Sequence, residues 1–129
     1  MPLVRIALPA DTAPAWRRAV ADGVHRALVD TVDVPLGDRF QLIEPRAHDE
    51  RIIDAAYLGI ARGDGAVIIT ISLRRGRSDA EKRALYRAIA GNLAAAPGVR
   101  REDVMIVLSE NDPVDWSFGA GVAQYAPGP

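Results

Sequence analysis

The second residue of the chain is a proline whose position allows acid–base chemistry. In the opening stretch "MPLVRIALP", Pro2 stands directly behind Met1. Aminopeptidases remove methionine before a small second residue, which would leave Pro2 with a free secondary amine. Such an amine titrates near neutral pH, because α-amino groups have pKa values of roughly 7.7–8.0. The alternative is purely structural, since proline has no N–H to donate and is tolerated at the first residue of a strand.

Three arginines in the stretch "LRRGRS" indicate a site for an anion. They lie between a predicted strand and a predicted helix, whose free N–H groups also attract anions. In an extended segment, residues 75 and 77 point to one side and residue 74 to the other. We therefore expect Arg75 and Arg77 to hold a carboxylate by bidentate contacts, and Arg74 to be an exterior charge. A solvated basic turn is the alternative.

A carboxylate and two aromatic residues complete the candidate site. Asp38 in "PLGDRF" either forms a turn or lies near the amine and raises its pKa by its charge. Trp116 and Phe118 in "DWSFG" either anchor the end of the chain in the core or form the wall of a small pocket. The two histidines are interpreted as unrelated to the site, with His25 structural or at the surface and His48 solvated in a loop.

The composition excludes several classes of site. The chain has no cysteine, which removes disulfides, thiolate catalysis and cysteine-based metal centres. Its two histidines lack the spacing of a ligand pair, so we expect no metal. The net charge of −1 does not favour nucleic acid or an anionic membrane. No stretch approaches 18 apolar residues, which predicts a cytoplasmic protein without a membrane span. The many alanines and arginines are typical of a GC-rich bacterial genome.

The strands and helices that must position these residues are predicted to form a repeated strand–helix–strand pattern. The length of 129 residues fits a single domain, with pseudo-repeat halves at about 2–45 and 66–110 and a tail at 111–129. An offset of 65 superposes the halves and places Asp38 on Asp103. Each half is predicted as strand–helix–strand, over residues 3–8, 14–32 and 39–44, and then 66–73, 78–96 and 104–110.

Two such units predict an α/β (α+β) fold. Each crossover is long enough for a parallel pair of strands, so we expect two consecutive βαβ units to form a four-stranded mixed sheet with two helices on one face. If the first strands of the two units are antiparallel neighbours, Pro2 lies beside the arginine cluster. The strands are apolar on both sides, so a further layer or a partner subunit should cover the other face.

These residues together resemble the tautomerase superfamily, and within it the malonate semialdehyde decarboxylases. The resemblance covers nearly the whole chain and rests on Pro2 behind Met1, "VPLGDRFQ" with Asp38, "RGRS" with Arg75 and Arg77, and "NDPVDWSFGAG" with Trp116 and Phe118. It implies a homotrimer without a cofactor, and a pocket in which the proline nitrogen faces two arginines.

Two positions depart from the pattern of that family. The family has Arg-Pro-Arg-Ser where this chain has Arg75, Gly76, Arg77 and Ser78, which affects the rigidity and register of the arginine pair. Tyr125 stands where the family has phenylalanine, so the wall of the substrate pocket is expected to be more polar.

The resemblance implies a lyase that decarboxylates a small 3-oxo acid such as malonate semialdehyde. Protonated Pro2 would be the general acid, Asp38 would keep it protonated, and the arginine pair would bind the carboxylate. The first alternative is an isomerase, a keto–enol tautomerase in which neutral Pro2 is the base. A hydratase or dehalogenase of a small unsaturated acid would need a further acid or base, for which the sequence offers no clear candidate. The remaining alternative is a non-catalytic protein that keeps Met1 and binds small carboxylates.

Overall fold

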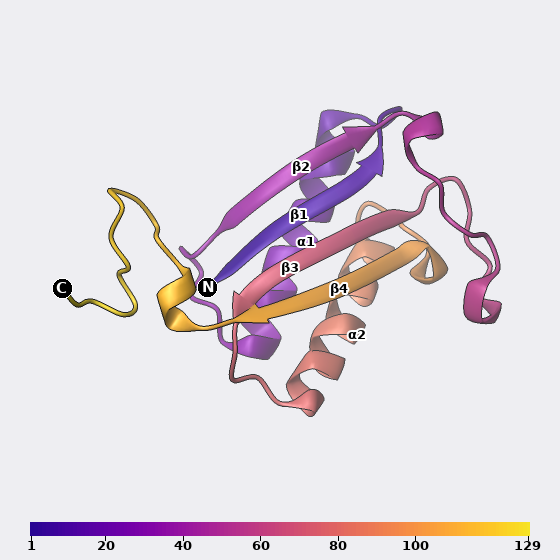
Figure 1. The fold of residues 1–129 in the computed structure, drawn as a ribbon. Helices are drawn as coiled ribbons and strands as arrows, with labels where there is room; N and C mark the ends of the chain where they lie inside the picture. The colour runs from indigo at the N-terminus through magenta and orange to yellow at the C-terminus, as the bar shows by residue number, and fades with distance from the viewer.

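The structure, a computed structural model that describes residues 1–129, consists of two βαβ units joined by a long connection (Figure 1). The first unit contains β1 (Pro2–Pro9), α1 (Pro14–Val32) and β2 (Phe40–Arg46), and the second contains β3 (Val67–Arg74), α2 (Asp79–Ala95) and β4 (Val104–Asn111). Short 3₁₀ turns lie at His48–Glu50, Tyr57–Gly59, Arg101–Asp103 and Pro113–Asp115. The expected fold class is confirmed.

The four strands form one mixed sheet in the order β2-β1-β3-β4. The two outer pairs are parallel, and the central pair β1·β3 is antiparallel, with Pro2 opposite Leu73. Leu3 pairs with Phe40 in one unit and Ile68 pairs with Met105 in the other, so the registers of the two units differ by the same offset of 65 residues. This pairing brings the start of the chain next to the arginines that follow β3.

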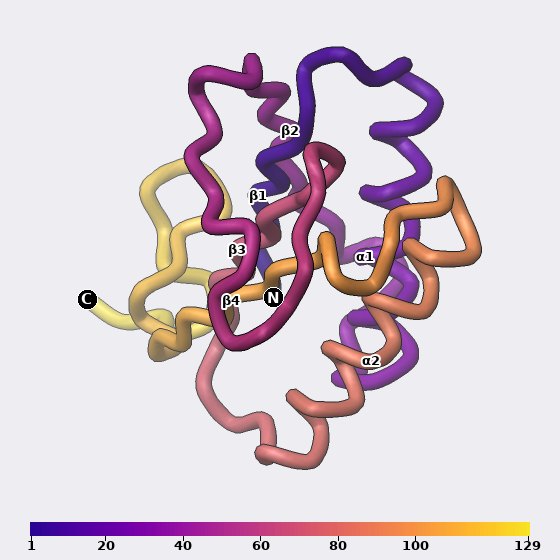
Figure 2. The backbone as a smooth tube through the Cα atoms, turned by 90° about the vertical axis from the view of Figure 1, so that its right-hand side faces the viewer, coloured from indigo at the N-terminus to yellow at the C-terminus, as the bar shows by residue number.

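Both helices cover one face of the sheet and enclose the hydrophobic core (Figures 1 and 2). Alternate residues of the central strands point to the helices, and every third or fourth residue of each helix points back at them. Each fully buried aliphatic side chain contributes about 1.5–3 kcal/mol to the stability of the fold. The core consists of Val4, Ile6, Leu8, Val20, Ala21, Val24, Ala27, Leu28, Val32, Val34, Val67, Ile69, Ile71, Leu73, Leu85, Ile89, Leu93 and Val99.

The other face of the sheet carries apolar side chains and no helix. Leu42 of β2 is 52% exposed and Met105 of β4 is 46% exposed. The connection between the units and the C-terminal tail both lie on this side, near opposite ends of the strands (Figure 2). The connection brings Ile52 and Tyr57 to a pocket shared with Met105. Neither of the two helices combines the length and the apolar composition needed to cross a membrane.

Candidate active site

A pocket of about 590 Å³ opens at the end of the sheet where β1 begins and β3 ends. Segments far apart in the sequence meet here because β1 and β3 are antiparallel and the C-terminal tail follows β4 to the same end (Figure 1). The pocket combines the N-terminal residue with carboxylates, guanidinium groups and aromatic rings. Its lining residues are Met1, Asp33, Pro35, Gly37, Asp38, Phe40, Arg74, Arg77, Phe118 and Tyr125.

The free amine of the chain faces a buried carboxylate in this pocket. The nitrogen of Met1 lies 3.6 Å from Asp38 Oδ2, and the Asp38 side chain is only 8% exposed. Neither carboxylate oxygen of Asp38 has a hydrogen-bond partner. A buried carboxylate without a donor is costly, so its place beside the amine indicates a functional role.

The pKa of this amine depends on opposing effects. Burial lowers the pKa of the Met1 amine, and the charges of Arg77 and Arg74 lower it further, whereas the charge of Asp38 raises it. The net shift is downward. While Met1 is attached, Pro2 is the first residue of β1, and its nitrogen is an amide that does not titrate. Removal of Met1 would make Pro2 the residue that carries the free amine at this end of the sheet.

Two arginines line the pocket, but they are Arg74 and Arg77 rather than the expected Arg75 and Arg77. Arg74 is the last residue of β3, and its guanidinium carbon lies 4.8 Å from the centre of the Tyr125 ring. Arg77 donates from Nη1 to the Arg74 carbonyl at 2.9 Å and from Nη2 to the Val32 carbonyl at 3.4 Å. These contacts hold the Arg77 side chain in place at the pocket.

Arg75 lies outside the pocket, which corrects the expected pairing. Its side chain is 61% exposed, and Nε lies 3.3 Å from Asp112 Oδ1 in the tail. The expectation assumed that the chain stays extended from residue 74 to 77. Instead β3 ends at Arg74, and Gly76 has a φ of 133°, a value that side-chain-bearing residues rarely adopt. The strand alternation therefore no longer decides which arginine faces the amine, and Arg74 is not an exterior charge.

Aromatic residues of the tail form one wall of the pocket. Phe118 and Tyr125 line it directly, and their rings meet edge to face at 5.2 Å. Trp116 stands behind Phe118, with the two rings stacked at 5.4 Å, and its Nε1 donates to Asn111 Oδ1 at 2.6 Å. Of the three aromatic residues expected at the substrate, Trp116 thus supports the wall and does not line the pocket.

The Tyr125 hydroxyl makes the wall partly polar. Burial raises the pKa of the Tyr125 hydroxyl, and the nearby negative charge of Asp38 raises it as well. The phenol is therefore neutral at physiological pH and is able to donate a hydrogen bond. The turn that carries Phe118 and Tyr125 is tied by Gln124, whose Oε1 accepts from the Phe118 N–H at 2.9 Å and whose Nε2 donates to the Gly119 carbonyl at 3.1 Å.

Sequence reasoning assigned no role to four residues of the pocket: Asp33, Pro35, Gly37 and Phe40. Phe40 opens β2, and its ring centre lies 5.9 Å from that of Phe118. Asp33 ends α1 in a left-handed conformation with a φ of 57°. Glycine or asparagine is usual at such a helix end, so the aspartate in "DTVDVP" was a detectable signal. The two histidines lie elsewhere: His25 is 6% exposed and donates from Nε2 to the Leu36 carbonyl at 2.8 Å.

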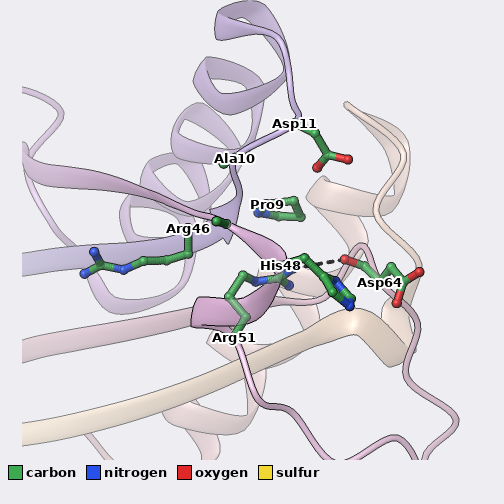
Figure 3. Close-up of a pocket in the computed structure, with 8 residues that line it drawn as sticks. Pro9, Ala10, Asp11, Arg46, His48, Arg51 and Asp64 are labelled. Atoms are coloured by element: carbon green, nitrogen blue, oxygen red, sulfur yellow. Dashed lines mark hydrogen bonds between the residues drawn. The ribbon is translucent and has the colours of Figure 1, made fainter.

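A second pocket of about 410 Å³ lies at the opposite end of the sheet and includes His48 (Figure 3). Its lining residues are Pro9, Ala10, Asp11, Arg46, Ala47, His48, Arg51 and Asp64, so it does not include Asp103, the counterpart of Asp38. Asp103 accepts from the Gly63 N–H at 2.7 Å. Arg51, in the second pocket, donates to the Asp64 carbonyl at 3.1 Å (Figure 3). No free amine reaches it, because the chain continues into β3. The first pocket therefore differs from it by combining a free amine with carboxylates and guanidinium groups.

The structure contains no cluster of three or more histidine, cysteine, aspartate or glutamate side chains that could hold a metal ion. The chemistry of the first pocket is that of an amine, two aspartates and two arginines. Such a site can bind a small anion through the guanidinium groups and can transfer a proton through the amine.

Comparison with known proteins identifies relatives across almost the whole chain. A family model described as a tautomerase enzyme matches residues 38–119. The probable tautomerase YusQ of Bacillus subtilis (strain 168) is 37% identical over 124 residues, which covers 96% of this chain and 98% of the relative.

Solved structures extend the similarity to the three-dimensional fold. The malonate semialdehyde decarboxylase FG41, inhibited by 3-bromopropiolate, is 42% identical with a TM-score of 0.90, covering 95% of this chain and 93% of that one. A second malonate semialdehyde decarboxylase, described with decarboxylase and hydratase activities, is 32% identical with a TM-score of 0.89, covering 95% of each chain. Less similar structures share the fold alone, among them a symmetric trimer of a fused 4-OT with 23% identity and a TM-score of 0.76.

Proposed function

Since the chain belongs to the tautomerase family, we propose that it is a cofactor-independent decarboxylase of a small 3-oxo acid such as malonate semialdehyde, with Pro2 as the general acid. One observation carries the proposal: the start of the chain lies in a pocket with two arginines and with Asp38, whose carboxylate accepts no hydrogen bond. The similarity to two malonate semialdehyde decarboxylases supports the same substrate class.

The reaction breaks the bond between the carboxylate carbon and the neighbouring CH₂ carbon. Carbon dioxide leaves, and the bonding electron pair becomes an enolate with its negative charge on the carbonyl oxygen. The ammonium group of Pro2, freed by removal of Met1, stabilises that oxygen by a charged hydrogen bond and supplies a proton. Asp38 would oppose loss of this proton, because a neighbouring negative charge raises the pKa of an amine, as the charge of Asp38 does for the Met1 amine. A proton on carbon completes the product, which is acetaldehyde when the substrate is malonate semialdehyde.

Arg74 and Arg77 bind the carboxylate before it leaves. Ion pairing alone would stabilise the charged substrate more than the departing neutral CO₂ and would slow the reaction. The arginines must therefore hold the carboxylate twisted out of the plane of the carbonyl group, so that the breaking bond overlaps with it. The contacts of Arg77 with two backbone carbonyls support this role, because they fix the position from which it binds. The apolar ring of Phe118 favours CO₂ over the anion.

A keto–enol tautomerase is the second candidate, and the lowered pKa of the amine favours it. Burial lowers the pKa of the Met1 amine, and Arg77 and Arg74 lower it further, so a Pro2 amine in the same place would meet the same effects. A neutral Pro2 would be a base that moves a proton from carbon to carbon. The probable tautomerase YusQ supports this reading. A hydratase is a related alternative, since one similar structure is described with that activity.

We also infer that the protein is a homotrimer. The apolar sheet face opposite the helices supports association, since Leu42, Met105 and other apolar side chains there are half exposed. Trimers with this fold are known among less similar structures. Light scattering coupled to size-exclusion chromatography tests the inference, with an expected mass of three times the 13.9 kDa chain. A monomer at micromolar concentration would contradict it.

The function is tested first by intact mass and then by turnover. A mass lower by one methionine than the translated chain is expected, and a retained Met1 would favour a non-catalytic carboxylate-binding protein. Malonate semialdehyde should then release CO₂ and acetaldehyde without added metal or cofactor. Titration of the Pro2 nitrogen by ¹⁵N NMR separates the two enzyme candidates. A pKa above about 7 favours the decarboxylase, and a lower value favours the tautomerase.

A further inference from the structure

Asp33 lines the pocket, and the fold alone does not explain why an aspartate occupies this position. It terminates α1 with φ 57° and ψ 33°, a left-handed conformation that costs an aspartate more than a glycine. Its negative charge also stands at the carboxyl end of the helix, where the backbone dipole favours cations. Residues that break two local rules at once are expected at functional sites. Asp33 lies at such a site, because it lines the pocket that contains the free amine.

The position of Asp33 is set by its neighbours in the chain. The Val32 carbonyl accepts from Arg77 Nη2 at 3.4 Å, which brings the end of α1 to the guanidinium group of Arg77. Asp33 nevertheless takes part in no ion pair of the structure. Its carboxylate is therefore a negative charge at the pocket that no contacting cation neutralises.

Asp33 changes the total charge that a substrate meets. Arg74 and Arg77 contribute two positive charges, and Asp33 and Asp38 contribute two negative charges. Tyr125 is neutral, because its pKa is raised. With the amine protonated, the pocket thus has one positive charge, which a single carboxylate neutralises. Without Asp33 it would have two, and a dicarboxylate would match it better.

We propose that Asp33 makes the pocket selective for monocarboxylates by repelling a second carboxylate on the substrate. The selectivity arises from an unfavourable contact with the wrong ligand, a common source of specificity in binding sites. This inference rests on the proposed function, since the charge count assumes a protonated amine. It names the substrate class of that site as 3-oxo acids with one carboxylate.

Malonate semialdehyde and oxaloacetate test the proposal as a matched pair. Oxaloacetate is malonate semialdehyde with a carboxylate in place of the aldehyde hydrogen, and it has the same 3-oxo acid group. For Asp33→Asn, the ratio of kcat/KM for oxaloacetate to kcat/KM for malonate semialdehyde should rise about two- to fivefold, the size of a coupling between exposed charges. The rise should shrink at high ionic strength, because salt screens such charges. Oxaloacetate decarboxylates slowly by itself, so rates are corrected with an enzyme-free blank.

Asp30→Asn is the control, because Asp30 is an exposed aspartate of the same helix that does not line the pocket. It removes the same charge from the whole protein and should leave the ratio unchanged. An unchanged ratio in Asp33→Asn, or an equal rise in both variants, would overturn the proposal. Asparagine tolerates the left-handed conformation, so the Asp33 variant is expected to fold.

A binding measurement separates this inference from the proposed function. Propionate and succinate differ by one carboxylate in the same way but undergo no reaction. Calorimetry on the wild-type protein and on Asp33→Asn should show that the substitution improves succinate binding relative to propionate about two- to fivefold. That result supports the charge selectivity even if neither oxo acid is decarboxylated. Equal effects on the two ligands would contradict the selectivity even in an active decarboxylase.

Discussion

Replacing Arg77 and Arg75 separately tests the assignment of the arginine pair. The two residues lie two positions apart and carry the same side chain, yet their surroundings differ. Arg77 lines the pocket and is held by the carbonyls of Arg74 and Val32. Arg75 is exposed and pairs with Asp112. Arg77→Ala removes a guanidinium group from the pocket, whereas Arg75→Ala removes only a contact between the loop after β3 and the tail.

The expected magnitudes follow from these contacts. Hydrogen bonds to a charged group are worth about 1.5–3 kcal/mol, which corresponds to a loss of about 10- to 150-fold in kcat/KM for Arg77→Ala. An exposed ion pair such as Arg75 with Asp112 is worth about 0–1 kcal/mol, so Arg75→Ala should lose fivefold or less. Arg77→Lys keeps the charge but not the planar fork and should lie between the two alanine variants.

Initial rates of CO₂ release from malonate semialdehyde measure these losses, with urea unfolding as a check on stability. The comparison is internal, because both alanine variants remove one positive charge from the same loop. If Arg75→Ala loses as much activity as Arg77→Ala at equal stability, the wrong pair of arginines has been assigned to substrate binding. If neither variant loses activity, Arg77 does not bind the substrate.

Three further predictions concern the wall, the core and the surface. Gln124→Ala removes both hydrogen bonds that tie the turn of Phe118, so it should lower kcat/KM severalfold while urea stability stays within about 1 kcal/mol; a large loss of stability would show a structural role instead. Ile69→Ala in the centre of β3 should cost about 2–5 kcal/mol in urea unfolding, and a cost below 1 kcal/mol would mean that the core repacks. The hydrogen bond from Arg39 holds the pKa of Asp22 below its ordinary 3.8, so this pair stabilises the fold above that pH and loses its effect as the pH falls through the lower folded value. Asp22→Asn should therefore reduce the loss of stability between pH 5 and 3 in urea unfolding. The same loss in the variant as in the wild-type protein would show that the pair of Asp22 and Arg39 does not contribute to this pH dependence.

Much of the fold could be predicted because its determinants are local. The apolar periods of strands and helices are short-range signals, and the capping box of Ser78 and Glu81 marked the start of α2. The repeat of the strand–helix–strand pattern then led to the antiparallel central pair, which places Pro2 near the arginines. This part of the site depends only on topology, and the register of Pro2 with Leu73 agrees with it.

The remaining site residues depend on backbone conformations that the pattern did not reveal. Gly76 interrupts the extended segment, so alternation from β3 reached Arg74 but not beyond it. Trp116 is displaced from the pocket because its indole N–H bonds to Asn111 and leaves Phe118 in front. Asp33 reaches the pocket because α1 ends in a left-handed residue, a property of the helix end rather than of its apolar stripe.

The agreement of the two registers has a consequence for the redesign of this chain. A polypeptide made of two equivalent units has two equivalent sheet ends but only one free amine, so joining the units leaves one end without a free amine. The aspartate at that end, Asp103, accepts a hydrogen bond from the Gly63 N–H of the connecting segment and is 5% exposed. A circular permutant that begins at residue 66 would exchange the two ends. Its new amine would start β3 near Asp103, and the amine now beside Asp38 would become a peptide bond.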